Sequence, residues 1–145
     1  MKEVTIKLKH LLNEVEGLVS VSTADAFAYK PSTERWSKKE ILGHLIDSGI
    51  NNLQRFTEIQ YQPRPYSIRK YAQDALVKAN DYQDADIKAL LTLGISLNQR
   101  ILSVIDRQTE DTLRYTVLVD EEQFDLAFLI KDYVDHTEHH INQLK

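Results

Sequence analysis

The sequence predicts an all-α protein: a four-helix bundle with one long crossover connection, folded as a single domain over residues 1–145. Four segments repeat apolar residues at the spacing of a helix, and the prolines fall in the connections between them. A composition that is 42% hydrophobic and 28% charged is typical of a globular domain with a real core. Disorder and a small disulfide-stapled fold are therefore excluded.

The first helix is predicted over residues 2–19, because leucine and valine recur there every three or four positions. The polar segment that follows, residues 20–36, contains Pro31 and several hydroxyl side chains, which favours a loop. A short turn is expected within this loop at residues 24–27.

Ser37 begins the second helix in a capping box. Its hydroxyl can accept a hydrogen bond from the Glu40 amide, while the Glu40 side chain reaches back to the start of the helix. Trp36 lies where an apolar side chain can fix the approach of the chain to the helix. Helical register continues to about residue 60, after which Pro63 and Pro65 prevent the helix from continuing.

Two connections have distinct patterns. Residues 61–83 are too many for a tight helix hairpin, so we expect this segment to cross over the bundle, with one short helical turn at residues 71–78. Residues 113–119 are rich in side chains that favour an extended strand, but the sequence indicates no partner strand for them.

The remaining two helices have acidic residues at their N-termini. Asp84 and Asp86 precede the third helix, which is predicted to end near residue 107. Asp125 can cap the fourth helix, whose apolar periodicity continues to the end of the chain.

Charge and composition exclude several classes of function. A net charge of −4 with scattered basic residues is not the pattern of a nucleic-acid-binding protein. No apolar run reaches the length of a membrane span, and the charged N-terminus lacks the apolar core of a signal peptide, so we expect a cytoplasmic protein. The absence of cysteine excludes thiolate metal sites and a cysteine nucleophile.

Histidine is the residue type left for metal chemistry. His136 and His140 are one turn apart on the fourth helix and lie about 40° from each other, at the border of its buried face. This spacing lets two imidazoles meet one metal ion, and His44 on the second helix could supply a third if the two helices are neighbours. The same spacing also occurs on exposed helix faces without function. His139 points away from the border, and His10 is interpreted as a surface residue.

A polar stripe extends from His44 along the second helix. Asp47, Asn51 and Arg55 lie within about 60° of it, so they are candidate catalytic or substrate-orienting groups. A solvated helix face would have the same pattern. Four aromatic residues are instead expected in the core: Trp36, Phe56, Phe128 and Tyr133.

Two segments resemble the DinB-like superfamily, which includes YfiT-type metal-dependent hydrolases and bacillithiol transferases. One is residues 36–48, WSKKEILGHLIDS, continued by Asn51-Asn52 and Arg55-Phe56, and the other is residues 132–143, DYVDHTEHHINQ. The resemblance implies a four-helix bundle that is often a homodimer. It also implies a three-histidine site for zinc, nickel or a similar divalent ion. Carried over by position, the metal ligands are His44, His136 and His140.

The resemblance further implies a reaction in which the metal holds a low-molecular-weight, bacillithiol-like thiol as thiolate for S-transfer to a small electrophile. A chain without cysteine suits such an enzyme, because the cosubstrate supplies the sulfur. Arg55 would suit a carboxylate of that thiol. Three alternatives stay open: hydrolysis by metal-bound water, a non-catalytic stress-response or ligand-binding protein, and a purely structural dimerisation bundle.

Overall fold

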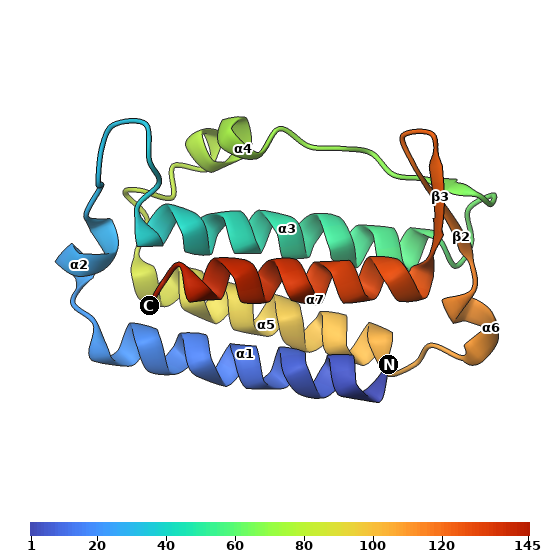
Figure 1. The fold of residues 1–145 in the computed structure, drawn as a ribbon. Helices are drawn as coiled ribbons and strands as arrows, with labels where there is room; N and C mark the ends of the chain where they lie inside the picture. The colour runs from blue at the N-terminus through green and yellow to red at the C-terminus, as the bar shows by residue number, and fades with distance from the viewer.

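The computed structural model describes residues 1–145, and four long helices form its body (Figure 1). These are α1 (Lys2–Val21), α3 (Lys38–Glu58), α5 (Ile87–Ile105) and α7 (Leu126–Asn142). Both α1 and α3 pack against α5 and α7. No helix combines the length and the apolar character needed to cross a membrane. The predicted four-helix bundle is confirmed, with helix ends close to those expected.

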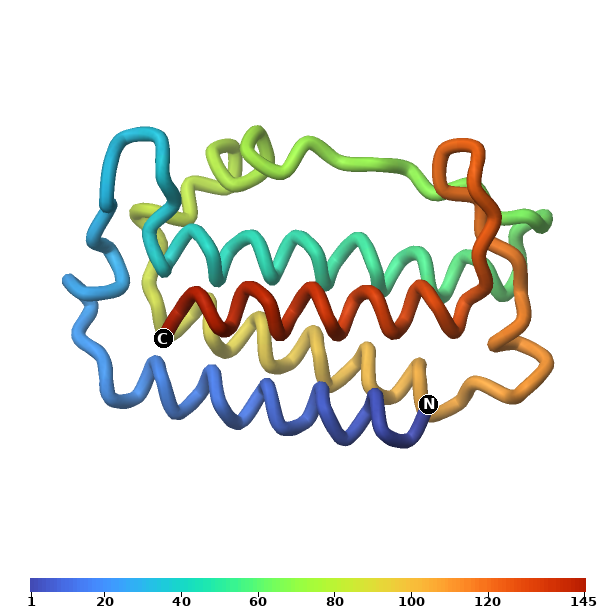
Figure 2. Tube along the Cα trace, viewed as in Figure 1, coloured from blue at the N-terminus to red at the C-terminus, as the bar shows by residue number.

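The connection between α3 and α5 crosses the bundle as predicted. It runs back along the length of α3, so that α3 and α5 point in the same direction, as the colours in Figure 2 show. The short helix expected within it is α4 (Gln73–Ala79), which packs on α3. The turn expected between α1 and α3 is the short helix α2 (Ala24–Ala28).

The extended segment near residue 116 has partner strands, contrary to our expectation. Strand β2 (Thr116–Val119) lies between β1 (Tyr66–Ser67) and β3 (Glu122–Asp125), parallel to β1 and antiparallel to β3. It follows α6 (Glu110–Leu113), a single helical turn. The sequence did not indicate these partner strands, because β1 is too short to show an alternating apolar pattern and β3 contains acidic residues that are typical of turns. This small sheet joins the crossover to the start of α7.

Side-chain caps fix the starts of three long helices, and the caps predicted at Ser37 and Asp125 are confirmed. Ser37 Oγ accepts from the Glu40 amide at 3.1 Å, and Glu40 Oε2 accepts from the Ser37 amide at 2.8 Å. Asp86 caps α5 and Asp125 caps α7, each by accepting the amide three residues on, at 2.8 Å. Each cap satisfies a backbone donor that has no partner within its helix.

The four aromatic residues expected in the core have different outcomes. Phe56 and Tyr133 are buried, with ring centroids 5.9 Å apart in an edge-on contact. Trp36 is only half-buried. The prediction is wrong for Phe128, which is 47% exposed and stacks on Phe124 with ring centroids 4.4 Å apart. Phe124 lies on β3, so the missed strand is the reason for this error.

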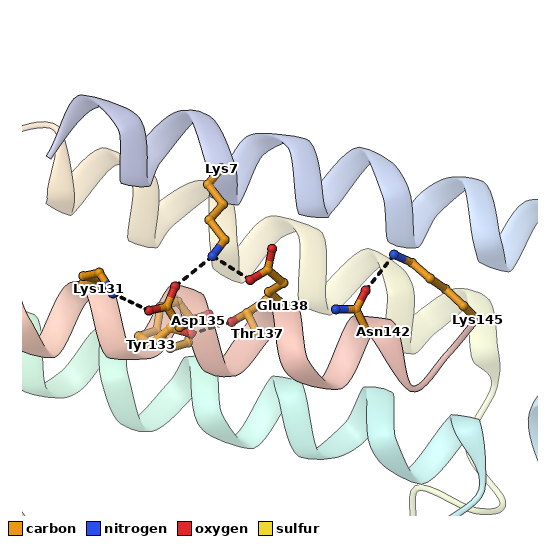
Figure 3. A network of polar contacts seen from close by, with 8 residues as sticks. All are labelled: Lys7, Lys131, Tyr133, Asp135, Thr137, Glu138, Asn142 and Lys145. Atoms are coloured by element: carbon orange, nitrogen blue, oxygen red, sulfur yellow. Dashed lines mark hydrogen bonds and ion pairs between the residues drawn. The ribbon is translucent and has the colours of Figure 1, made fainter.

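An ion-pair network joins α7 to α1 (Figure 3). Lys7 Nζ lies 2.8 Å from Asp135 Oδ1 and 2.7 Å from Glu138 Oε2, and Lys131 Nζ lies 2.7 Å from Asp135 Oδ2. These side chains are partly exposed, so each pair contributes little to stability. The network shows that Asp135 and Glu138 lie on the side of α7 that faces α1.

The end of the crossover packs closely on α3 at Gly43. The ring of Tyr82 covers this glycine, and a Cβ there would overlap the Tyr82 ring. Tyr82 is buried, and its hydroxyl donates to Asp47 Oδ1 at 2.7 Å, which holds the ring in place.

We predict that Gly43→Ala destabilises the protein by about 1–3 kcal/mol, because overpacking outweighs the gain of about 1 kcal/mol in helix propensity. Chemical unfolding monitored by circular dichroism measures the change. Gly17→Ala is the matched control, since Gly17 lies within α1 and its Cβ would meet nothing within 4 Å. That substitution is expected to stabilise the protein slightly. A Gly43→Ala protein as stable as the wild type would contradict the prediction.

Candidate metal centre

Three imidazoles from two helices converge where the start of α3 meets the end of α7. His44 comes from α3 and His136 and His140 from α7, and their ligand nitrogens all lie within 4.8 Å of one another. The Nε2 atoms of His44 and His136 are 3.2 Å apart. We call these residues the three-histidine cluster. The helix adjacency that the sequence could only assume is present.

The spacing of the cluster suits a divalent ion. Two imidazole nitrogens bound tetrahedrally to zinc lie about 3.3 Å apart, since each Zn–N bond is about 2.0–2.1 Å. The observed 3.2 Å between His44 and His136 matches this value. Imidazole is a ligand type that suits zinc and nickel. The cluster could therefore hold a divalent metal ion.

The second nitrogen of each α7 imidazole has a polar neighbour. His140 Nδ1 is 2.8 Å from Gln143 Oε1, and His136 Nδ1 is 3.4 Å from Ser48 Oγ. Such partners orient a ring and leave its other nitrogen free for a metal ion. Gln143 also contacts the exposed His139, with 3.3 Å between Gln143 Nε2 and His139 Nε2. The cluster is therefore fixed by residues that do not themselves belong to it.

His44 is the most enclosed member of the cluster. It is fully buried, and the Trp36 ring packs on it with centroids 4.9 Å apart. Its Nδ1 is buried without a hydrogen-bond partner. His44 is thus held by packing, and its Nε2 faces His136.

Burial keeps the cluster neutral. Burial, with a smaller contribution from the neighbouring imidazoles, lowers the pKa of His44 and of His136 to about 4. The pKa of His140 is also lowered, mainly by burial. Protonated imidazoles at this spacing would repel one another in a poorly solvated site. At neutral pH the ring nitrogens therefore have lone pairs available for a metal ion.

The three polar candidates on α3 make different contacts, although Asn51 and Arg55 share one surface hollow. Asp47 is buried, and its Oδ1 accepts from Tyr82 and from Asn80 Nδ2, which joins the crossover to α3. Asn51 donates to the Asp47 carbonyl at 2.9 Å and lines a surface hollow that does not reach the three-histidine cluster. Of the three, only Arg55 lines a cavity that also contains His136.

That cavity, which we call the hairpin cavity, lies between α3, α7, the crossover and the β2–β3 hairpin. Its volume is about 460 Å³, which suits a small molecule. The Arg55 guanidinium donates to the Arg69 carbonyl at 2.9 Å and lies 5.7 Å from the Tyr71 ring centroid. No carboxylate forms an ion pair with Arg55, so a cation is available to a ligand beside His136.

Sequence reasoning missed several residues around the cluster. Gln143 is three residues after His140, a spacing that could have indicated a contact within α7. Tyr71 and Phe124 reach the hairpin cavity only through the crossover and the hairpin. Their positions depend on the small sheet, so no local sequence signal could have found them.

Comparisons with known proteins support the fold. YfiT from Bacillus subtilis, described as a probable metal-dependent hydrolase with an unusual four-helix bundle topology, superposes with a TM-score of 0.88 and 22% identity, over 99% of this chain and 84% of its own. The mycothiol-dependent maleylpyruvate isomerase superposes with a TM-score of 0.77 and 13% identity, and this chain covers 60% of its length.

A DinB-like protein from Bacillus subtilis, YjoA, has a TM-score of 0.68 and 16% identity, over 98% of this chain and 86% of its own. No curated protein matches the sequence significantly. The profile of the DinB superfamily matches residues 7–144, nearly the whole chain. The chain therefore belongs to the DinB superfamily.

Proposed function

We propose that this protein is a metal-dependent enzyme that transfers a low-molecular-weight thiol to a small electrophile. In this proposal His44, His136 and His140 bind a divalent ion, with zinc or nickel as the best candidates. The observation that carries the proposal is the convergence of three neutral imidazoles beside a cavity that holds an unpaired cation. Location in the cytoplasm and assembly as a homodimer stay predictions from the sequence.

The protein's own residues would prepare the thiol for reaction. A bound divalent ion would stabilise the thiolate at neutral pH. Arg55 would hold a carboxylate of the thiol cosubstrate in the hairpin cavity, Ser48 would orient His136 beside it, and Gln143 would orient His140. The stacked rings of Phe124 and Phe128 on the cavity wall would exclude water from the sulfur.

The sulfur would have to come from the cosubstrate, because the chain contains no cysteine. The mycothiol-dependent isomerase, whose fold this chain shares, depends on such a thiol. Hydrolysis is the second candidate, and the description of YfiT as a probable metal-dependent hydrolase favours it. The two candidates differ in whether sulfur or water would occupy the open metal position, which can be measured.

His136→Ala should weaken the binding of zinc by more than about 100-fold, because losing a ligand should cost more than the 10–100-fold typical of losing an outer partner. Competition titration against a coloured chelator gives the affinity, and elemental analysis gives the stoichiometry. His139→Ala is the matched control, since His139 is the exposed imidazole on the same turn. It should retain near wild-type affinity. Equal affinity in the two variants would contradict the ligand assignment.

Thiol coordination can be tested on protein loaded with cobalt(II). Mercaptosuccinate should produce a sulfur-to-cobalt charge-transfer band, and Arg55→Gln should raise its apparent Kd by about tenfold, since a hydrogen bond between charged groups is lost. Binding of uncharged 2-mercaptoethanol to the same variant should be unchanged. The absence of a band with either thiol, in protein that holds cobalt, would exclude the thiol proposal and favour hydrolysis.

The metal-free protein should lose stability as the pH falls from about 6.5 to about 4. The pKa of His136 is lowered from 6.5 to about 4 on folding, so in this window the unfolded chain binds a proton that the folded chain does not. Urea unfolding across this range measures the slope, which should be shallower in His136→Gln. His10→Gln, on α1 outside the cluster, should keep the wild-type slope. Parallel curves for all three proteins would contradict the pKa assignment.

A further inference from the structure

A second cavity reaches the three-histidine cluster from the other side. We call it the α2 cavity, because it lies between α2, the loop that follows α2, the start of α3 and the end of α7. Its volume is about 610 Å³, again in the range of small-molecule sites. Trp36, Ile41, His140 and Gln143 are among its lining residues.

The two cavities share no lining residue, and each exposes a different imidazole of the cluster. His136 lines the hairpin cavity and His140 lines the α2 cavity, although their ring centroids are only 4.5 Å apart. The cluster thus lies at the boundary between two separate spaces. This arrangement suits a reaction with two substrates that meet at one centre, because each can bind without displacing the other.

The α2 cavity has a clear charge preference. Its lining contains two cations, Arg35 and Lys38, and no carboxylate. Neither cation forms an ion pair, whereas the nearby Lys30 pairs with Glu40 at 2.6 Å. A positive hollow in a protein of net charge −4 is a local feature that overall composition does not explain.

The hairpin cavity differs in this respect. Its lining includes Asp132 as well as Arg55, and its Lys70 forms an ion pair with Asp120 at 2.6 Å. It therefore has mixed charge. Of the two cavities, only the α2 cavity presents cations without any carboxylate on its wall.

The rest of the α2 cavity suits a molecule with an apolar part. Tyr29, Trp36 and Ile41 contribute an apolar and aromatic wall, and Trp36 packs directly on the buried ring of His44. A ligand with an anionic group at Arg35 and Lys38 and an apolar body on this wall would extend toward His140.

We propose that the α2 cavity binds the second substrate of the enzyme, a small molecule that bears a carboxylate or a phosphate held by Arg35 and Lys38. This inference rests on the proposed function, because it assigns the thiol to the hairpin cavity and an acidic electrophile to the α2 cavity. Binding of the anion itself requires neither the metal nor the thiol.

Trp36 is the only tryptophan of the chain and lines the α2 cavity, so its fluorescence reports on this cavity specifically. Succinate and inorganic phosphate are titrated separately into metal-free and zinc-loaded protein at constant ionic strength. Calorimetry on the same samples detects binding that leaves the emission unchanged. We expect saturable binding of at least one probe with a change in Trp36 emission, and the tighter probe identifies the anionic group.

Arg35→Gln combined with Lys38→Gln should raise the Kd of that probe at least about tenfold, because charge-assisted hydrogen bonds are lost. Arg55→Gln is the matched control, since Arg55 lines only the hairpin cavity of the two, and it should leave the Trp36 titration unchanged. Circular dichroism verifies that the variants fold; Arg35 is exposed and Lys38 half-exposed.

Two results would overturn the inference. One is the absence of binding by both probes in both measurements. The other is binding that the double variant leaves unchanged, or that Arg55→Gln abolishes, which would place the anion elsewhere. The cobalt–thiolate band tests the thiol proposal separately: a band without anion binding overturns only the α2 cavity, and anion binding without a band overturns only the thiol assignment.

Discussion

The packing of α3 against α7 is the constraint on which the rest of the structure depends. It places the fully buried His44 within reach of two imidazoles one turn apart on α7, with Nε2 of His44 3.2 Å from Nε2 of His136. Burying three polar rings is unfavourable unless their nitrogens find partners. The helices can hold this arrangement because contacts elsewhere fix their positions. Gly49 is one such contact, since a Cβ there would lie 2.7 Å from Leu97 of α5.

Contacts made by residues next to the cluster ligands help to set the rotation of both helices. The ring of Tyr82 lies on Gly43, and its hydroxyl binds Asp47, so the crossover holds α3 from outside the bundle. On α7, the acidic residues that pair with Lys7 face α1, which leaves the histidines on the side toward α3. The positions of the three histidines therefore depend on the crossover as well as on the four long helices.

Membership of the superfamily establishes the fold but does not select the chemistry. The related structures include a probable hydrolase and a thiol-dependent isomerase. The possible reactions must therefore be distinguished by the residues and cavities around the cluster. Two cavities with different charge open on different imidazoles of one cluster. A hydrolase needs a single organic substrate beside its metal-bound water, whereas a group transfer needs two. The presence of both cavities is the physical basis for preferring transfer.

The sequence alone determined the four long helices, the caps Ser37 and Asp125, and the border positions of the histidines, because periodicity and capping are local properties of the chain. Tertiary structure decided the pairing of β2 with β1 and β3, the outward position of Phe128, and the separation of Asp47 from Arg55 into different surroundings. It also decided that the cluster lies between two cavities. These features depend on contacts between segments that are distant in sequence. The local sequence of one segment does not indicate which other segment it will contact.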